Sequence, residues 1–178
     1  MDQNIEISYY NSPVGEMILG TFMGEVVLAD WRYRARRDQV DYRIKKVLNS
    51  DFLIQENSLH QEVKSQLEAY FSGGLRKFDL PLRFVGTSFQ NEVWNELMKI
   101  PFGESKTYLE LSRLLGNEKA IRAVASANGA NAISIIVPCH RVIGSDGSLT
   151  GYAGGLKAKE KLLRIEGIYP GNQLGLFE

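Results

Sequence analysis

The chain has 178 residues, of which 44% are hydrophobic, and its 21 basic and 21 acidic side chains cancel. This composition predicts a globular protein with a buried core, in one domain or two small ones. It excludes a membrane span, because the longest uncharged apolar run, residues 123–139, contains Ser, Asn, Gly and Pro and is too polar to cross a bilayer.

The chain begins without the basic-then-apolar order of a signal peptide, so we expect a cytoplasmic protein with no membrane partner. Three short runs rich in Ile, Val and aromatic residues follow, at residues 4–10, 15–22 and 24–31. Turn-like stretches separate them, which predicts a meander of antiparallel strands. The next stretch, WRYRARR at 31–37, interleaves four arginines with aromatics, as a nucleic-acid patch does. We interpret it as a solvated loop or a helix start.

Two amphipathic helices are predicted next. The first has Ser58 as its candidate N-cap, apolar residues at helical spacing and a Gly-Gly stop. We assign no role to His60 in its first turn. An extended linker, residues 78–86, leads to the second helix, which starts near Thr87 and ends at Pro101. We therefore divide the chain into a strand-rich part, 1–85, and a helical part, 86–178.

A pair of short helices is predicted within the helical part. Residues 107–115 and 118–127 are joined by a tight turn at Gly116 and Asn117, which is the pattern of a helix-turn-helix. Between residues 106 and 164 there are nine basic and four acidic side chains, a local excess of five. Short helix pairs also serve as plain packing units, and a basic stretch also occurs as a solvated helix face. A DNA partner and a structural role both stay open here.

The only cysteine, Cys139, lies between Pro138 and His140, and Arg141 follows. One cysteine and two histidines form no internal disulfide and make a poor zinc site, so no metal is expected. Most free cysteines are small buried hydrophobes. A reactive thiol is the alternative, because Pro138 stops the apolar run before it and the neighbouring base and cation favour the thiolate. In an extended strand Cys139 and His140 point to opposite faces, so a base role requires a turn or a bridging water.

The order of the motifs from residue 87 to 167 resembles one family. TSFQNEVWNELMKIPFGE and TYLELSRLLGNEKAIRAVASAN precede PCHRVIG, and GYAGGLKAKEKLLRIEG follows it. This set is similar to the O6-alkylguanine-DNA alkyltransferases, also called methylated-DNA-protein-cysteine methyltransferases. The resemblance, with the element pattern, implies an α+β fold: a small N-terminal antiparallel-sheet domain with a helix, and a helical C-terminal domain with a winged-helix-like helix-turn-helix.

The resemblance also implies a function. The protein is expected to transfer the alkyl group from O6-alkylguanine in DNA to its own cysteine, in a single turnover and without a cofactor. Its partner is expected to be double-stranded DNA, bound through the minor groove with little sequence specificity, and the protein is expected to act as a monomer. The damaged base has to be flipped out, since a pocketed sulfur cannot reach O6 in a stacked pair.

Carried over by position, the resemblance assigns five residues to the chemistry. Cys139 corresponds to the alkyl acceptor, His140 to a base that works through water, and Glu166 to the carboxylate that orients the histidine. Tyr108 corresponds to the donor to guanine N3 and a promoter of nucleotide rotation. Asn131 corresponds to the hinge between the helix pair and the thiol segment. Tyr108 as a core residue, Glu166 as a partner of a lysine and Asn131 as a turn former are the structural alternatives.

Further residues are implied for binding. Arg122 corresponds to the finger that fills the vacated base stack, and an ordinary surface cation is its alternative. The DNA surface is expected to comprise Tyr108, Arg122, Ala123 and Ser126. The alkylguanine pocket, with GYAGG as its wall, is expected to comprise Ser134, Val137, Pro138, Tyr152, Ala153 and Gly154.

Two other classes of protein fit parts of the pattern. An alkyltransferase-like module binds lesions but replaces the acceptor cysteine, and Cys139 argues against it. A cysteine hydrolase uses Cys, His and an acid to turn over an acyl substrate. The mass of the protein after reaction with methylated DNA distinguishes all three classes.

Overall fold

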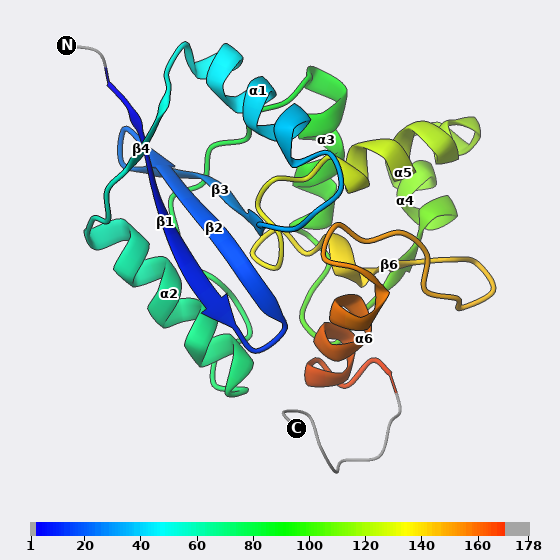
Figure 1. Cartoon of the computed structure of the whole chain (residues 1–178). Helices are drawn as coiled ribbons and strands as arrows, with labels where there is room; N and C mark the ends of the chain where they lie inside the picture. The colour runs from blue at the N-terminus through cyan, green and yellow to red at the C-terminus, as the bar shows by residue number, and fades with distance from the viewer. Residues whose placement is uncertain (1–2, 170–178) are drawn as a thin grey trace.

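The computed structural model describes residues 3–169, and Figure 1 shows a sheet on one side and a group of helices on the other. The predicted meander is confirmed: β1 (Ile5–Ser12), β2 (Gly15–Phe22) and β3 (Glu25–Trp31) pair antiparallel. A short strand that was not predicted, β4 (Phe52–Ile54), pairs parallel with β1, so the strand order is β3-β2-β1-β4. In the described part, no helix is both long and apolar enough to cross a membrane.

Helix α1 (Arg37–Leu48) follows the arginine-rich stretch, so a helix does start there. Its buried face, Val40, Ile44 and Leu48, repeats every four residues, which is the spacing of one helix face. The expected solvation of the stretch is wrong for Arg34, whose side chain is only 8% exposed. A buried acid, Asp30, attracts this arginine into the interior.

Helix α2 (Ser58–Phe71) packs against β1 and β2. Its N-cap is Asn57 and not the predicted Ser58, because the Asn57 side chain accepts the backbone N–H of His60. The His60 ring in turn accepts the Asn57 N–H through Nδ1. His60 is therefore a buried capping residue, a structural role that satisfies otherwise unpaired helix N–H groups.

The helical part starts with α3 (Ser88–Leu97), capped by Thr87 as its sequence suggests. The helix ends before Pro101, because Lys99 and Ile100 form tighter turns. The predicted helix pair is present as α4 (Tyr108–Leu114) and α5 (Ile121–Gly129), with a 3-10 turn, Glu118–Ala120, between them. The remaining elements are β5 (Lys106–Thr107), β6 (Val142–Ile143), a 3-10 turn at Cys139–Arg141, and α6 (Leu156–Ile165).

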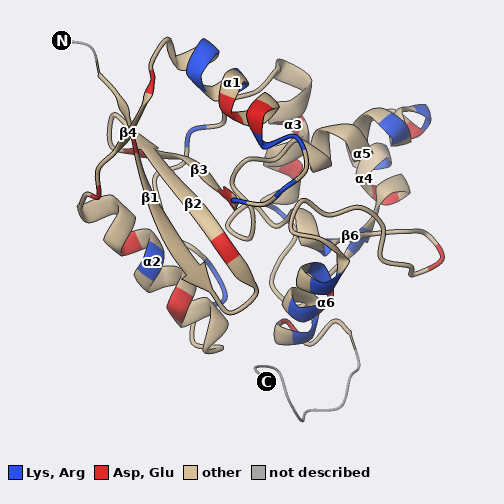
Figure 2. Cartoon of the chain, viewed as in Figure 1, with Lys and Arg blue, Asp and Glu red and all other residues tan. Residues whose placement is uncertain are grey.

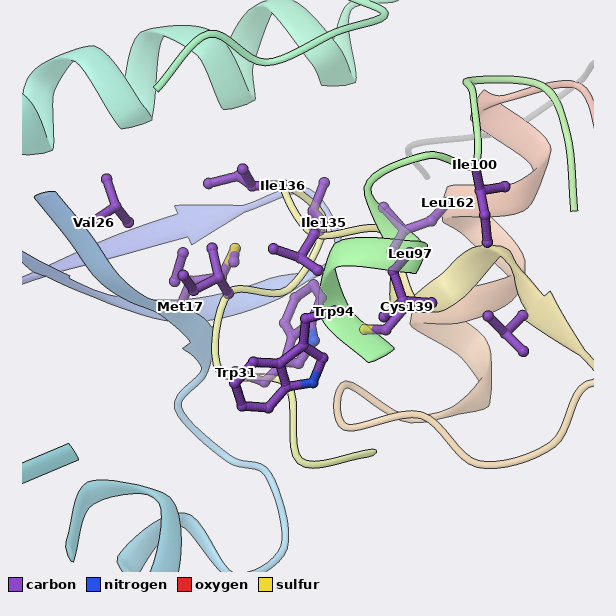
Figure 3. Packing of buried hydrophobic residues seen from close by; sticks show 14 of the residues in the cluster. Met17, Val26, Trp31, Trp94, Leu97, Ile100, Ile135, Ile136, Cys139 and Leu162 are labelled. Carbon is purple, nitrogen blue, oxygen red and sulfur yellow. The ribbon is translucent and has the colours of Figure 1, made fainter. Parts of the chain in front are cut away.

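One large core joins both parts of the chain. The same cluster contains Met17 and Trp31 from the sheet, Trp94 from α3 and Leu162 from α6, and Figure 3 shows these residues packed around the thiol segment. Cys139 belongs to this cluster and is 3% exposed. The two parts of the chain therefore bury apolar surface against each other. The domain boundary at residue 85 stays a prediction.

Candidate active site

The thiol segment is a compact turn. The Val137 N–H donates to the Ile133 carbonyl at 2.9 Å, and Ile136 N–H donates to the Ser134 carbonyl. Ile135 has a φ of 72°, a conformation that is strained for a β-branched side chain. The chain then forms the 3-10 turn after Pro138, so the backbone does turn where the sequence predicts.

Asn131 holds this turn together. Its Oδ1 accepts the Ile133 N–H at 2.9 Å, and its Nδ2 donates to the Val137 carbonyl at 3.0 Å. The same Nδ2 lies 3.2 Å from Sγ of Cys139. Burial raises the pKa of the Cys139 thiol, and the Asn131 hydrogen bond opposes this rise. The resting sulfur is therefore a protonated thiol. The Asn131 amide is already in place to donate a hydrogen bond to the thiolate when it forms.

A buried carboxylate connects the residues after the thiol. Oε1 of Glu166 lies 2.6 Å from Nε2 of His140 and accepts the Tyr70 hydroxyl at 2.7 Å. The Arg141 guanidinium donates to both Glu166 oxygens, at 2.7 and 3.0 Å, and to the Ile100 carbonyl. All these side chains are at least nine-tenths buried. Such a network holds the imidazole in one orientation.

The charge states in this network follow from its contacts. Burial by itself raises the pKa of Glu166, but the hydrogen bond from His140 and the hydrogen bonds and charge of Arg141 outweigh it and hold the pKa at about 2. Burial lowers the pKa of His140 despite the adjacent carboxylate. A neutral His140 donates its Nε2–H to Glu166, which leaves Nδ1 as the basic nitrogen. This Nδ1 is buried and has no protein partner among the described residues.

The helix pair presents the residues predicted for DNA. Arg122, Ala123 and Ser126 are exposed on α5, and Figure 2 shows further Lys and Arg on α6, near the start of α5 and along the loop between β3 and α1. A cleft of about 520 Å³ lies beside α5. Its lining comprises Arg34, Ala35, Tyr108, Ile121, Arg122, Ala125, Asn128, Gly129, Thr150, Gly151, Tyr152 and Ala153.

This cleft brings together only some of the predicted pocket residues. Tyr108, Tyr152 and Ala153 line it, and Asn128 in its lining donates to the carbonyl of Cys139 at 3.4 Å. The predicted Ser134, Val137, Pro138 and Gly154 do not line the cleft. Ser134 instead donates to Asp30, Val137 is fully buried, Pro138 borders a different cavity, and Gly154 packs against Trp31.

Tyr70 and Lys159 at the site were not singled out from the sequence, and Arg141 was expected to act on the thiol and not on Glu166. Tyr70 looks like an ordinary core residue of α2, and no local signal points to Glu166 as its partner. Arg141 was noted for its charge, but its clamp on Glu166 depends on the fold. Lys159 is fully buried and donates to the carbonyls of Val142 and Thr150 at 2.6 and 2.9 Å. Burial lowers its pKa to about 8. Its position on the apolar face of α6 was the sequence feature that could have predicted its burial.

Among residues 3–169 no three His, Cys, Asp or Glu side chains are grouped so that they could hold a metal ion. The site consists instead of a thiol, an imidazole and a carboxylate, and α5, which exposes Arg122, lies beside the adjacent cleft. This arrangement can generate a thiolate within a protected interior.

Comparisons with known proteins agree on the same region. Residues 88–168 match the family model described as the DNA binding domain of 6-O-methylguanine DNA methyltransferase. A methylated-DNA–protein-cysteine methyltransferase of Methanosarcina acetivorans is 53% identical over 69% of this chain and 79% of its own length. Its Mycobacterium leprae counterpart is 42% identical over 88% of both chains. The crystal structure of Mycobacterium tuberculosis OGT in complex with DNA superposes with a TM-score of 0.81 at 36% identity, covering 98% of this chain and all of that one.

Proposed function

This chain belongs to the methylated-DNA–protein-cysteine methyltransferases, and on that premise we propose that Cys139 is the acceptor and His140 and Glu166 its activating pair. The protein repairs DNA by transferring an alkyl group from O6-alkylguanine to a cysteine. Cys139 is the only cysteine in the sequence. The observation that supports its activation is the buried contact between His140 and Glu166, with Nδ1 of the imidazole left free to accept a proton.

The proposed step is one displacement at carbon. The Cys139 thiol gives its proton through a water molecule to Nδ1 of His140, and a sulfur electron pair forms the new bond to the alkyl carbon. The bond between this carbon and O6 breaks, and its electrons pass to the guanine, which takes up one proton on its ring. The proton lost by the thiol balances the proton gained by guanine. The alkyl thioether is stable, so one protein repairs one lesion.

Each neighbour of the sulfur has a distinct part in this proposal. Asn131 donates to Sγ and thereby stabilises the thiolate, since hydrogen bonding to a charged form favours that form. Glu166 is ionised, so it stabilises the imidazolium that forms when His140 accepts the proton. Tyr108 lies in the cleft and donates weakly to the Thr150 carbonyl at 3.4 Å. Its hydroxyl is the proposed donor to guanine N3.

We propose that the damaged nucleotide is flipped into the cleft beside α5. Arg122 lies on the exposed face of this helix and in the cleft lining, where its side chain can occupy the gap left in the base stack. Ala123 and Ser126 are small exposed residues on the same helix, so its backbone can approach the minor groove closely. This mode of binding reads little sequence, which suits a lesion that occurs anywhere in DNA. We also expect the protein to act as a monomer and in the cytoplasm.

Intact mass after incubation with duplex DNA containing O6-methylguanine tests the proposal. We expect the protein to gain the mass of one methyl group, located on Cys139 by peptide mapping, and to stop after one equivalent. Cys139→Ala is expected to bind undamaged duplex as the parent does and to gain no mass. Binding without any mass gain in the parent would indicate a lesion-binding module, and repeated turnover without an adduct would indicate a hydrolase.

A further inference from the structure

A buried aspartate at the end of β3 accepts hydrogen bonds from three segments of the chain. Asp30 is completely buried. Its Oδ2 accepts Nη1–H groups from Arg34 at 2.7 Å and Arg37 at 2.8 Å, and its Oδ1 accepts the Ser134 hydroxyl at 3.0 Å. Ser134 belongs to the thiol segment, so this single carboxylate links the N-terminal sheet to the region of Cys139.

Arg34 extends this link to the DNA-binding helix. Its Nη2 donates to the carbonyl of Gly129, the last residue of α5, at 2.6 Å, and its Nη1 donates to the carbonyl of Asn131 at 3.0 Å. Arg43 of α1 donates to the Ala130 carbonyl between them at 2.8 Å. The last carbonyls of a helix lack partners within the helix, and cations near this end are favourable. Two arginines of the N-terminal part therefore cap the carboxyl end of α5.

The backbone of β3 holds the same segment from the other side. The Ala29 N–H donates to the Ala132 carbonyl at 2.9 Å, and the Ser134 N–H donates to the Ala29 carbonyl at 2.6 Å. Residues 129–131 are thus bound by arginine side chains, and Ala132 and Ser134 by the backbone of β3. The segment carries Asn131, whose amide contacts the acceptor sulfur.

We propose that Arg34 is a positioning residue for alkyl transfer, which couples the end of the DNA-binding helix to the acceptor thiol by holding Asn131 in place. The inference rests on the proposed role of Cys139. A guanidinium suits this task because its planar fork binds one carboxylate and two carbonyls at fixed angles, which an ammonium cannot do. The 8% exposure of the side chain keeps these bonds out of water, where they are stronger.

This coupling gives the N-terminal part a role in the reaction. DNA that binds α5 acts on a helix whose end is fixed to the sheet, so the sulfur stays at one distance from the flipped base. Without Arg34, two carbonyls and a carboxylate lose a donor, and we expect residues 129–131 to shift. A misplacement of about 1 Å at reacting atoms can slow a reaction by about 10²-fold.

The pH dependence of the reactivity of Cys139 provides a second measurement. Asp30 on β3 and Lys159 on α6 act on the Cys139 thiol through their charges, as Arg34 itself does, and Tyr108 and Tyr152 face it from the cleft. Loss of Arg34 removes a positive charge and loosens the Asn131 donor. Both changes disfavour the thiolate, so the pH at which the thiol becomes reactive should rise.

The test compares Arg34→Met and Arg34→Lys with the matched control Arg32→Ala. This control removes an exposed arginine of the same loop, which pairs with Glu16 at the surface. One assay measures single-turnover methyl transfer at saturating methylated duplex, together with duplex affinity. A second assay measures the rate at which iodoacetamide alkylates Cys139 from pH 6 to 10. Circular dichroism confirms the fold of each variant.

For Arg34→Met we expect transfer at saturating DNA to fall by ~10- to 100-fold, duplex affinity to change by less than about threefold, and the pH midpoint of alkylation to rise. Arg34→Lys, which retains the charge but not the fork, should reverse part of the midpoint shift and restore only part of the transfer rate. Arg32→Ala should match the parent. Folded Arg34 variants with parental transfer rate and midpoint would overturn the proposal, and if Arg34→Met does not fold, the Arg34→Lys results decide. Failure of the proposed function would show differently, as a parent protein that gains no methyl group.

Discussion

Oε1 of Glu166 lies 2.6 Å from Nε2 of His140, and both side chains are completely buried. The contact joins the residue after the thiol to the C-cap of α6, and the two are 26 positions apart in the chain. It fixes which imidazole nitrogen carries the proton. With Nε2–H directed at the carboxylate, Nδ1 is available as the base.

Glu166→Gln is expected to slow methyl transfer strongly. The amide can donate to Nε2 of His140 and so favour the wrong tautomer, and it gives no charge to stabilise the imidazolium. We expect the single-turnover rate to fall by about 10²-fold or more, with duplex affinity unchanged. Glu160→Gln is the matched control, because Glu160 lies on the same helix and pairs at the surface with Arg164. A variant at position 166 that reacts at the parental rate would rule out the orienting role.

Stability should fall in acid over a window set by the same carboxylate. The pKa of Glu166 is about 2 in the folded protein against an ordinary value of 4.5. The unfolded chain therefore binds more protons between these values, and the free energy of unfolding decreases as the pH falls from about 5 to 2. The shift corresponds to at most about 3 kcal/mol. Urea unfolding of the parent and Glu166→Gln at several pH values should show a steeper loss in the parent, and parallel curves would contradict the assignment.

Arg122→Ala should impair DNA binding and base flipping together. The side chain is exposed on α5 and lines the cleft, so its loss leaves the unstacked gap empty. We expect weaker duplex binding, measured by fluorescence anisotropy, and slower extrusion, measured with a fluorescent base beside the lesion. Parental binding should weaken with added salt, as contacts to phosphates require. Lys64→Ala is the control, since Lys64 pairs with Glu56 next to α2. Equal binding and repair by Arg122→Ala and the parent would remove the finger assignment.

The alkylated protein should be less stable than the free protein. Cys139 is 3% exposed within the core cluster, so a methyl group on its sulfur overpacks the interior, which typically costs about 1 to 3 kcal/mol. Methylation also crowds the sulfur that accepts the hydrogen bond of the Asn131 amide. We expect the S-methyl form to melt about 2 to 10 °C below the free form. Paired thermal unfolding curves on samples checked by mass provide the measurement, and an equal or higher melting temperature would show that the pocket is loose.

The sequence by itself determined the family, the reaction type and most of the elements. The strand meander, the capped helix after Thr87 and the helix pair around Gly116 depend on local periodicity and turn chemistry, which short windows of sequence contain. The turn at Pro138 is equally local, because proline fixes its own φ and lacks an N–H. The motif PCHRVIG suggested the proposed acceptor and base for the same reason: its residues are neighbours in the chain.

The tertiary structure alone decided which distant groups meet these residues. Tyr70 and Arg141 contact Glu166, and Asp30 contacts Ser134, across separations of 25 to 104 residues. Periodicity records whether a residue faces the core, but it holds no information on its partner there. The N-cap of α2 is Asn57 and not the predicted Ser58, because the capping box forms between Asn57 and His60. Buried polar groups must find hydrogen-bond partners in the folded chain, and only the packing of sheet against helices determines which partners are within reach.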